Sequence, residues 1–412
     1  MTNSLPPQEL IVIRGRGRVS ALGQSLDGLS AASPFTPRQL GLHSIPVAAL
    51  PTAAEAAVQE LRRSQPAYRQ LDRTVLLGLL AARQASAAAG WPTSSGIPAP
   101  GNQQPATSNQ LAVSIGSSRG ATGRLEEFHA EFLREGSVPV PASPLTTLGN
   151  VASWVAYDAG STGGASLSHS STCSSAFQAL GNATAWLRAG MATRFLAGGT
   201  EAPLTAFTLA QMQAIGIYSP FAAADFPCRP GAGKPSTFVL GEGAAVFALE
   251  KISTASLAEQ PHQPVAVLEG VGFGFEAIGS KTGLSADGQH FQQAMRSALG
   301  QAGCDLAEVD AVVLHSPGTP AGDAAERAAL RTVFGDELPL LLSNKWLIGH
   351  TLGASAALSL DFALHVLETQ QWPTPPFPTD LALVSGVRPL RRILVNAAGF
   401  GGNAASVVVA LQ

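Results

Sequence analysis

The stretch Ser170-Ser171-Thr172-Cys173-Ser174-Ser175-Ala176 places a single cysteine among small residues, just before a segment with helical spacing. Apolar residues recur three or four positions apart from Phe177 to Leu187, and Gly190 can end a helix. A cysteine at a helix N-terminus lies near unpaired N–H groups and the positive end of the helix dipole. We therefore expect Cys173 to ionise more easily than a free cysteine, although a lone cysteine is more often a small buried hydrophobe.

Composition indicates a large core and excludes two classes of partner. The 412 residues are 45% hydrophobic and 13% charged, and the formal net charge is −3. This balance argues against nucleic acid or an anionic membrane as a partner. A membrane span needs roughly 18 consecutive apolar residues. We expect no such span, because Asp361 interrupts the best candidate, at 352–367.

Cysteine and histidine usage indicates a reducing compartment and no metal site. Cys173, Cys228 and Cys304 are too few, and odd in number, for a disulfide framework, so we expect a cytoplasmic protein. No cluster of cysteine and histidine has the spacing of a zinc site. The N-terminus has no basic region followed by an apolar run, so no secretory signal is expected.

Strand-like and helix-like segments alternate along the chain in two similar halves. Strands are expected at 10–13, 111–115, 196–201, 238–250, 265–272, 311–314, 393–396 and 406–411, and helices within 51–90 and at 177–190, 288–302, 324–333 and 353–368. Arg14–Gly17 should end the first strand. The alternation predicts an α/β fold with mostly parallel sheets covered on both faces. The polar segment 251–264 is the best candidate join, which divides the chain into 1–255 and 256–412.

Two histidines lie at the ends of buried strands or shortly after them. His315 lies in Leu314-His315-Ser316-Pro317-Gly318-Thr319-Pro320, and His350 follows Lys345-Trp346-Leu347-Ile348-Gly349. Either histidine alone would more often be structural. Their occurrence together with Cys173, Lys345 and the loop Asn396-Ala397-Ala398-Gly399-Phe400-Gly401-Gly402-Asn403 favours catalysis.

With these motifs in this order, the chain resembles the β-ketoacyl synthase family of the thiolase-like superfamily. Segment 172–175 resembles the nucleophile motif, 197–201 and 239–244 the next two blocks, 315–323 the block written HGTxTxxGD, 345–350 the KxxxGH block, and 399–402 the C-terminal glycine block. The resemblance implies a five-layered αβαβα fold of two duplicated halves. The Cys-His-His set implies an elongating rather than an initiating synthase.

The resemblance also implies roles for the site residues. Cys173 would take an acyl group from an acyl carrier protein, and the enolate from malonyl-carrier would then attack it. The backbone N–H groups of Cys173 and Phe400 would bind the oxyanion, where one donor is worth roughly 3 kcal/mol. His315 and His350 would stabilise the enolate as neutral imidazoles. Lys345 would hold the site electrostatically and help orient His315. No metal or redox cofactor is implied.

Substrate and partner contacts follow from the same resemblance. Phe400 would gate the cysteine, with Gly399 and Gly401 beside it, and Thr319 would contact the phosphopantetheine arm. Arg119 stands where elongating synthases often have an apolar residue in the acyl pocket, and a buried arginine needs a partner. Dimerisation with itself or with a paralogous chain-length factor is expected.

Carrier proteins are acidic, so basic residues are the candidates for docking. Arg62, Arg63 and Arg69 form such a group, although an ordinary solvated helix face explains them equally well. Binding that weakens steeply with salt would support docking over the solvated face.

Several positions depart from the family pattern. Pro317 replaces a threonine that usually contacts pantetheine, Ser359 stands where an acidic residue commonly partners the lysine, and Ala398 replaces an aromatic residue. Segment 226–236 lacks the usual acidic-basic pattern. These changes suggest a stand-alone synthase of a specialised polyketide or polyene pathway.

Two alternatives remain. A chain-length-setting partner subunit would commonly lack the cysteine. A thiolase or a Cys-dependent hydrolase is the other alternative, but thiolases usually carry a second reactive cysteine, and segment 399–402 has none.

Overall fold

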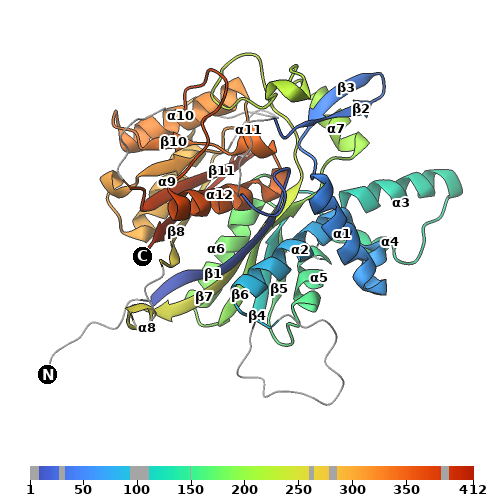
Figure 1. The fold of residues 1–412 in the computed structure, drawn as a ribbon, viewed down its shortest axis with the longest axis horizontal. Helices are drawn as coiled ribbons and strands as arrows, with labels where there is room; N and C mark the ends of the chain where they lie inside the picture. The colour runs from blue at the N-terminus through green and yellow to red at the C-terminus, as the bar shows by residue number, and fades with distance from the viewer. Residues whose placement is uncertain are drawn as a thin grey trace.

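Ten of the described strands form one mixed sheet (Figure 1). The computed structural model describes residues 9–26, 33–92, 111–148, 150–258, 264–277, 285–381 and 389–412. The strands of the sheet are β1 (Glu9–Val19), β4 (Leu111–Gly116), β5 (Ser166–His169), β6 (Arg194–Glu201), β7 (Gly243–Ser253), β8 (Ala266–Phe275), β9 (Ala311–Val313), β10 (Leu340–Leu342), β11 (Arg392–Gly399) and β12 (Asn403–Leu411). A separate hairpin consists of β2 (Thr36–Leu40) and β3 (His43–Val47).

The sheet consists of two five-stranded halves with the same topology. The first half runs β5-β4-β6-β7-β1 and the second runs β10-β9-β11-β12-β8, so both follow the order third, second, fourth, fifth, first. In each half the first three strands of this order are parallel and the last two pairings are antiparallel. The first strands of the two halves, β1 and β8, pair antiparallel at Val12–Val267 and Ile13–Ala266. This repeated order confirms the predicted duplication.

The two halves of the sheet form two separate layers. One layer of helices lies between them and one lies on each outer face, which gives five layers in all. α6 (Ser175–Arg188) and α12 (Ser355–Thr369) follow the third strand of their halves, contact each other, and contact strands of both halves. They form the middle layer (Figure 1). α2 (Arg73–Ala88) and α5 (Asn150–Asp158) cover the outer face of the first half, and α9 (Gln289–Ala302), with α10 (Pro320–Phe334) beside it, covers that of the second. The expected αβαβα arrangement is confirmed.

The remaining helices are short or lie outside these layers. They are α1 (Thr52–Ser64), η1 (Pro66–Gln70), α3 (Thr122–Glu135), α4 (Ala142–Thr146), α7 (Ala206–Ala214), η2 (Ala223–Asp225), α8 (Thr254–Ala258), η3 (Leu306–Glu308), α11 (Lys345–Ile348) and η4 (Leu352–Ala354). Of the helices in the described ranges, none is both long and apolar enough to cross a bilayer.

Two expectations about the strands are wrong. The sheet is not mostly parallel, because five of the nine pairings in its described strands are antiparallel. In the second half a tight turn joins the antiparallel strands β11 and β12, whereas in the first half the corresponding strands β6 and β7 are connected through α7 and η2. Arg14–Gly17 also does not end β1, which continues to Val19. Gly15 lets the strand lie directly on α2, since a Cβ there would come within 2.4 Å of the Ala85 carbonyl oxygen.

A buried ionic cluster joins β1 of the first half to α12 of the second. Asp361 is 1% exposed, and its carboxylate lies 3.1 Å from Arg16 Nε and 2.5 Å from Arg18 Nε. Arg16 also forms a bidentate pair with Glu368 at the edge of the cluster. The acid that interrupts the apolar run at 352–367 is therefore the counter-ion of two arginines.

We expect Asp361→Leu to lower the free energy of unfolding by about 3–5 kcal/mol, because Arg16 and Arg18 would lose their buried counter-charge. Denaturant unfolding measures this loss. The matched control is Glu368→Gln at the cluster's exposed edge, which should cost about 1 kcal/mol or less. Equal losses for the two variants would show that burial of Asp361 is unimportant.

Candidate active site

One cavity of about 360 Å³ gathers most of the predicted site residues. Loops that follow β4, β5, β9 and β10 supply its wall, as expected where the carboxyl ends of neighbouring strands share an edge. The predicted residues on this wall are Arg119, Cys173, His315, Thr319, His350, Gly399 and Phe400. Both halves of the chain therefore contribute to the same site.

The nucleophile loop is held in one conformation by the β11–β12 hairpin. Cys173 precedes α6 by two residues, and Thr172 adopts a left-handed φ of 54°. Gly399 lies directly against this loop, because a Cβ there would come within 1.6 Å of Thr172 Oγ1. No other residue fits at position 399 unless the loop moves. The hairpin thus keeps Phe400, which is 45% exposed, at the mouth of the cavity beside Cys173.

The Cys173 thiol is less acidic than its place before a helix suggested. Burial, together with the Glu201 carboxylate, raises its pKa to about 12, while Lys345 and Arg119 act in the opposite direction. The expectation of an easily formed thiolate is therefore wrong, because loss of water around the sulfur outweighs the favourable charges. The resting form is the thiol, and acyl transfer needs a proton acceptor.

His350 is held in a defined tautomer. The backbone N–H of Leu352 donates to His350 Nδ1 at 3.1 Å, so the proton of the neutral ring lies on Nε2. The ring packs on Phe238 with centroids 5.2 Å apart, and it meets the His315 ring edge to face at 5.3 Å. Phe291 packs on the other imidazole at 6.3 Å. These aromatic walls were not foreseen from the sequence.

Both imidazoles are neutral at physiological pH. Burial lowers the pKa of His350 to about 3, and the positive charge of Lys345 contributes. Burial also places the pKa of His315 well below its usual value, with further lowering by His350, Lys345 and His290. Neutral rings are the form that can donate from Nε2 without bringing a full positive charge into the cavity.

Glu201, at the end of β6, connects the two halves beneath the cavity. Its fully buried carboxylate accepts hydrogen bonds from Ser118 N (2.6 Å), Arg119 N (3.1 Å), Ser117 Oγ (3.1 Å) and Gly353 N (2.9 Å). Burial raises its pKa to about 7, and these hydrogen bonds limit the rise. The sequence signal for this role is an acid at the end of a strand of buried small residues.

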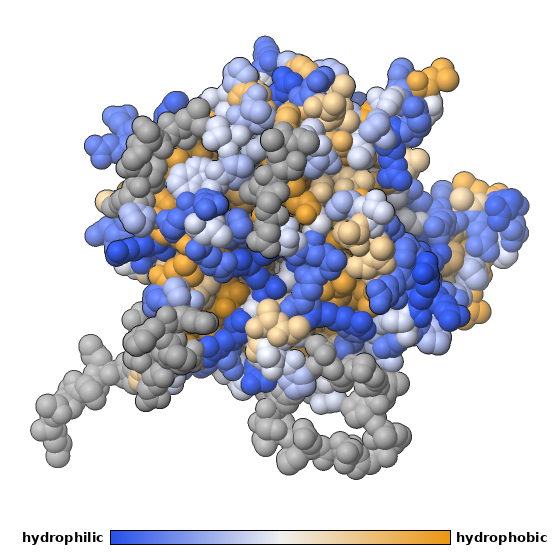
Figure 2. Space-filling view, viewed as in Figure 1, coloured by the Kyte–Doolittle hydropathy of each residue, from blue (hydrophilic) through white to orange (hydrophobic). Residues whose placement is uncertain are grey.

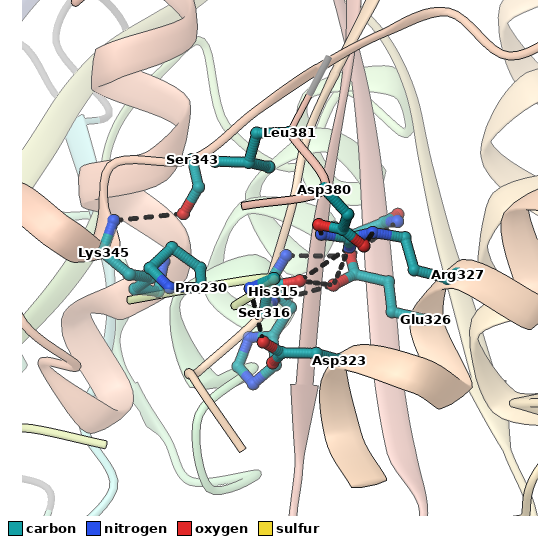
Figure 3. Close-up of polar contacts among 12 residues, drawn as sticks. Pro230, His315, Ser316, Asp323, Glu326, Arg327, Ser343, Lys345, Asp380 and Leu381 are labelled. Atoms are coloured by element: carbon teal, nitrogen blue, oxygen red, sulfur yellow. Dashed lines mark hydrogen bonds and ion pairs between the residues drawn. The ribbon is translucent and has the colours of Figure 1, made fainter. Parts of the chain in front are cut away.

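Glu326 performs a similar task for the His315 loop (Figure 3). Its carboxylate accepts hydrogen bonds at 2.8 Å from His315 N, Ser316 N and Ser316 Oγ, and at 3.2 Å from Asn396 Nδ2. Arg327 reaches back to Ser316 Oγ at 2.8 Å. The backbone on either side of the imidazole is therefore held by α10, one turn of helix away from the cavity wall.

Segment 226–236 is fastened to the same loop. Asp323 accepts hydrogen bonds from Gly318 N at 3.1 Å and Gly231 N at 2.8 Å, and burial raises its pKa to about 7. Thr237 N donates to the Gly318 carbonyl at 2.7 Å. This segment, noted for its unusual composition, thus braces the turn that carries Thr319.

Lys345 lies behind the wall rather than on it. Its ammonium group donates to Ser359 Oγ at 2.8 Å and Asn344 Oδ1 at 3.2 Å. Within the described residues it has no carboxylate in ion-pair distance and no hydrogen bond to His315, so any help that it gives in orienting that ring acts through its charge and not through a hydrogen bond. Burial lowers the pKa of Lys345 to about 8. A hydroxyl takes the place of the acidic partner, as the departure at position 359 suggested.

The other predicted residues lie away from the cavity. Gly401, with φ of 89°, is at the tip of the β11–β12 hairpin. Arg63 and Arg69 are exposed on α1 and η1, and Arg62 borders a separate cavity of about 620 Å³. Among the described residues, no three His, Cys, Asp or Glu side chains are placed to hold a metal ion.

The free energy of unfolding should fall in acid, because histidines of the unfolded chain bind protons at a pH at which the buried imidazoles stay neutral. For His350, with a folded pKa of about 3 against an ordinary 6.5, stability is lost as pH falls from 6.5 towards 3. When the pH is lowered from 7 to 5, the free energy of unfolding should fall by about 2 kcal/mol less in His350→Asn than in the wild type. Denaturant unfolding at both pH values measures this difference. Identical pH dependence in the two proteins would contradict the prediction.

Comparisons with known proteins agree on one family. The models described as "Beta-ketoacyl synthase, N-terminal domain" and "Beta-ketoacyl synthase, C-terminal domain" match residues 27–255 and 265–376. The tetracenomycin polyketide synthase ketoacyl synthase alpha subunit of Streptomyces glaucescens is 32% identical over 327 residues, which cover 73% of this chain and 74% of that protein. The 3-oxoacyl-[acyl-carrier-protein] synthase 2 of Staphylococcus aureus (strain COL) is 28% identical over 318 residues, covering 73% and 75%. The ishigamide ketosynthase/chain length factor structure shares the fold, with a TM-score of 0.80 and 21% identity over 98% of this chain and 99% of that one.

Proposed function

The chain belongs to the β-ketoacyl synthase family of condensing acyltransferases, and on that premise we propose that it joins an acyl group on Cys173 to the enolate of malonyl-carrier protein. The observation that carries this proposal is the shared cavity of Cys173, His315 and His350. A thiol and two neutral imidazoles line this cavity, and one imidazole has its Nε2 proton set by a backbone hydrogen bond.

In the first half-reaction, the sulfur of Cys173 attacks the thioester carbonyl of acyl-carrier. The thiol proton ends on the departing carrier thiol, and the acyl–sulfur bond to the carrier breaks. The backbone N–H groups of Cys173 and Phe400 are the proposed oxyanion donors. Gly399 serves this step because its missing side chain lets the hairpin lie against the nucleophile loop.

In the second half-reaction, the malonyl group loses carbon dioxide and its bonding electrons form a thioester enolate. Nε2–H donors of His315 and His350 would stabilise the enolate oxygen. The enolate carbon then attacks the acyl carbonyl on Cys173, and the cysteine sulfur leaves as a thiolate that takes up a proton from water to restore the thiol. Thr319 would contact the substrate's phosphopantetheine arm. We propose that no resident cofactor takes part.

Replacement of the nucleophile tests this assignment most directly. Cys173→Ala should abolish acyl loading and lower condensation by roughly three orders of magnitude or more, because no other thiol lines the described cavity wall. Mass spectrometry measures acyl loading of the protein, and product analysis measures condensation with malonyl-carrier. As a control, Cys304→Ala removes a thiol outside the cavity and should retain both activities. Condensation that survives in the Cys173 variant would refute the proposal.

The intact cysteine and histidine pair favours catalysis over a chain-length-setting subunit. The absence of cysteine from 399–402 disfavours a thiolase. The departures at Pro317, Ser359 and Ala398 affect the substrate wall and the lysine's surroundings, which supports a specialised polyketide or polyene pathway. Saturated-chain housekeeping activity from the protein alone would end that last proposal.

We propose residues 1–255 and 256–412 as the two structural halves of the chain. We also propose a cytoplasmic location for the protein.

We propose that an acidic carrier protein docks on Arg62, Arg63 and Arg69, because two of these side chains are exposed and all three lie on neighbouring turns. Arg63→Glu combined with Arg69→Glu should raise the KM for carrier-bound substrate roughly tenfold at low salt, with a smaller effect at high salt. Steady-state kinetics with malonyl-carrier and with malonyl-pantetheine give the ratio of the KM values for the carrier-bound and the carrier-free substrate. An unchanged ratio would assign these arginines to an ordinary solvated surface.

We propose that the chain dimerises through α3 and the edge of β5, with a second copy or a paralogous chain-length factor. α3 buries only Thr122, while Leu125, Phe132 and Leu133 are 56%, 50% and 73% exposed. Figure 2 shows hydrophobic side chains at the right of the molecule, where α3 projects in Figure 1. β5 ends the order of described strands in the sheet, so its outer edge is open to pairing.

A charge on this apolar face should prevent association. We expect Phe132→Arg to shift the protein from dimer to monomer in sedimentation equilibrium, because a guanidinium would have to be buried without a partner. Leu306→Arg alters a similarly exposed apolar residue on η3 and should leave the dimer intact. A Phe132 variant that remains dimeric would place the interface elsewhere.

A further inference from the structure

One wall residue of the cavity carries a charge that the proposed condensation does not use. Arg119 follows β4 and lines the same cavity as Cys173. Much of the remaining wall is apolar, including Met212, Ile215 and Ile217. A cation among such residues is costly unless something neutralises it.

The part of the chain that the structure describes supplies no counter-ion for this guanidinium. Its one side-chain hydrogen bond runs from Nη1 to Gln211 Oε1 of α7, at 2.8 Å. Gln211 is neutral, and within the described ranges no carboxylate lies in ion-pair distance of Arg119. A guanidinium has five N–H donors in a planar fork, so most of them remain available.

The acid that contacts the backbone of Arg119 is already occupied. Glu201 accepts the backbone N–H of Arg119, not its side chain, and three further donors surround that carboxylate. The other charged group that acts on the cysteine, Lys345, is also a cation, and both histidines are neutral. The groups around the acyl position therefore favour an anion in the cavity.

We propose that Arg119 selects acyl groups that end in a carboxylate, so that the substrate supplies the missing counter-charge. This inference rests on the proposed acylation of Cys173 and adds a substrate class to it. A carboxylate can accept two parallel N–H bonds from the fork, whereas a methyl-terminated chain leaves the cation against hydrocarbon. Gln211 acts as a positioning residue that holds Nη1.

Carrier-free acylation of Cys173 tests the inference. The probes are pantetheine thioesters in pairs of equal chain length: glutaryl with pentanoyl, adipoyl with hexanoyl, pimeloyl with heptanoyl, and suberyl with octanoyl. Intact-mass spectrometry gives the initial loading rates. At the length that reaches Arg119, the carboxylate-ended probe should load roughly tenfold faster than its partner, a difference of about 1.4 kcal/mol.

Variants connect that preference to the side chain. Arg119→Met should reverse the ratio of the two rates, and Arg119→Lys, which keeps the charge without the fork, should give an intermediate ratio. A ratio measured on one protein sample does not depend on how much of the sample is folded. Arg296→Met removes an exposed arginine of α9 and should keep the wild-type ratio.

Three results would overturn the inference: no carboxylate preference at any length, a ratio that Arg119→Met leaves unchanged, or faster loading of 3-oxohexanoyl than of adipoyl. In the first case, loading of only the methyl-ended probes would leave the proposed condensing function intact. Failure of every probe to load Cys173, together with failure of acyl-carrier to do so, would instead refute the proposed function.

Discussion

The buried carboxylate of Glu201 is the interaction on which the site depends. It collects donors from the loop after β4 and from Gly353, which belong to different halves of the chain. A buried donor left without a partner costs about 1–3 kcal/mol, so both segments are strongly constrained to close around this carboxylate. The adjacent residue Leu352 then presents its N–H to His350 and sets the tautomer of that ring. One acid thus positions both the wall that carries Arg119 and the imidazole of His350.

Duplication explains why groups so far apart in sequence meet. Cys173 follows the third strand of the first half and His350 follows the third strand of the second, while Arg119 and His315 follow the two second strands. Antiparallel pairing of β1 with β8 relates the halves by an approximate twofold arrangement, which turns equivalent loops towards each other. The middle helices α6 and α12 begin beside these loops. The cavity is therefore a product of the repeat and not of either half alone.

Burial gives the site its electrostatic character. Loss of water raises the pKa of the Cys173 thiol and lowers those of His315, His350 and Lys345, so it favours the neutral form of each. The groups expected to handle protons and transient negative charge are therefore all shifted towards their uncharged forms. The guanidinium of Arg119 lies on the same cavity wall and donates to the neutral Gln211. Among the described residues, Lys345 has only neutral hydrogen-bond partners, which is consistent with the serine at position 359.

Much of the fold and most of the site could be predicted from the sequence, because each depends on local patterns. The alternation of strand and helix indicated the duplicated layers, and short motifs identified Cys173, His315, His350 and the Gly399–Phe400 turn. The direction of the sheet pairings could not be predicted, since it depends on which strands become neighbours. The acidity of the cysteine was predicted in the wrong direction, because a helix start is visible in sequence while the depth of burial is not.

The sequence by itself thus determined the kinds of chemical group and their order along the chain. Only the tertiary structure decided which groups face each other, which of them lose contact with water, and which charge lacks a partner. Asp361 reads as an interruption of an apolar helix, and becomes a buried counter-ion only when α12 lies on Arg16 and Arg18. Glu201 ends a strand of small residues, and becomes the link between the two halves only when Gly353 reaches it. Electrostatic energies depend on distance and on exclusion of water, and three-dimensional packing sets both.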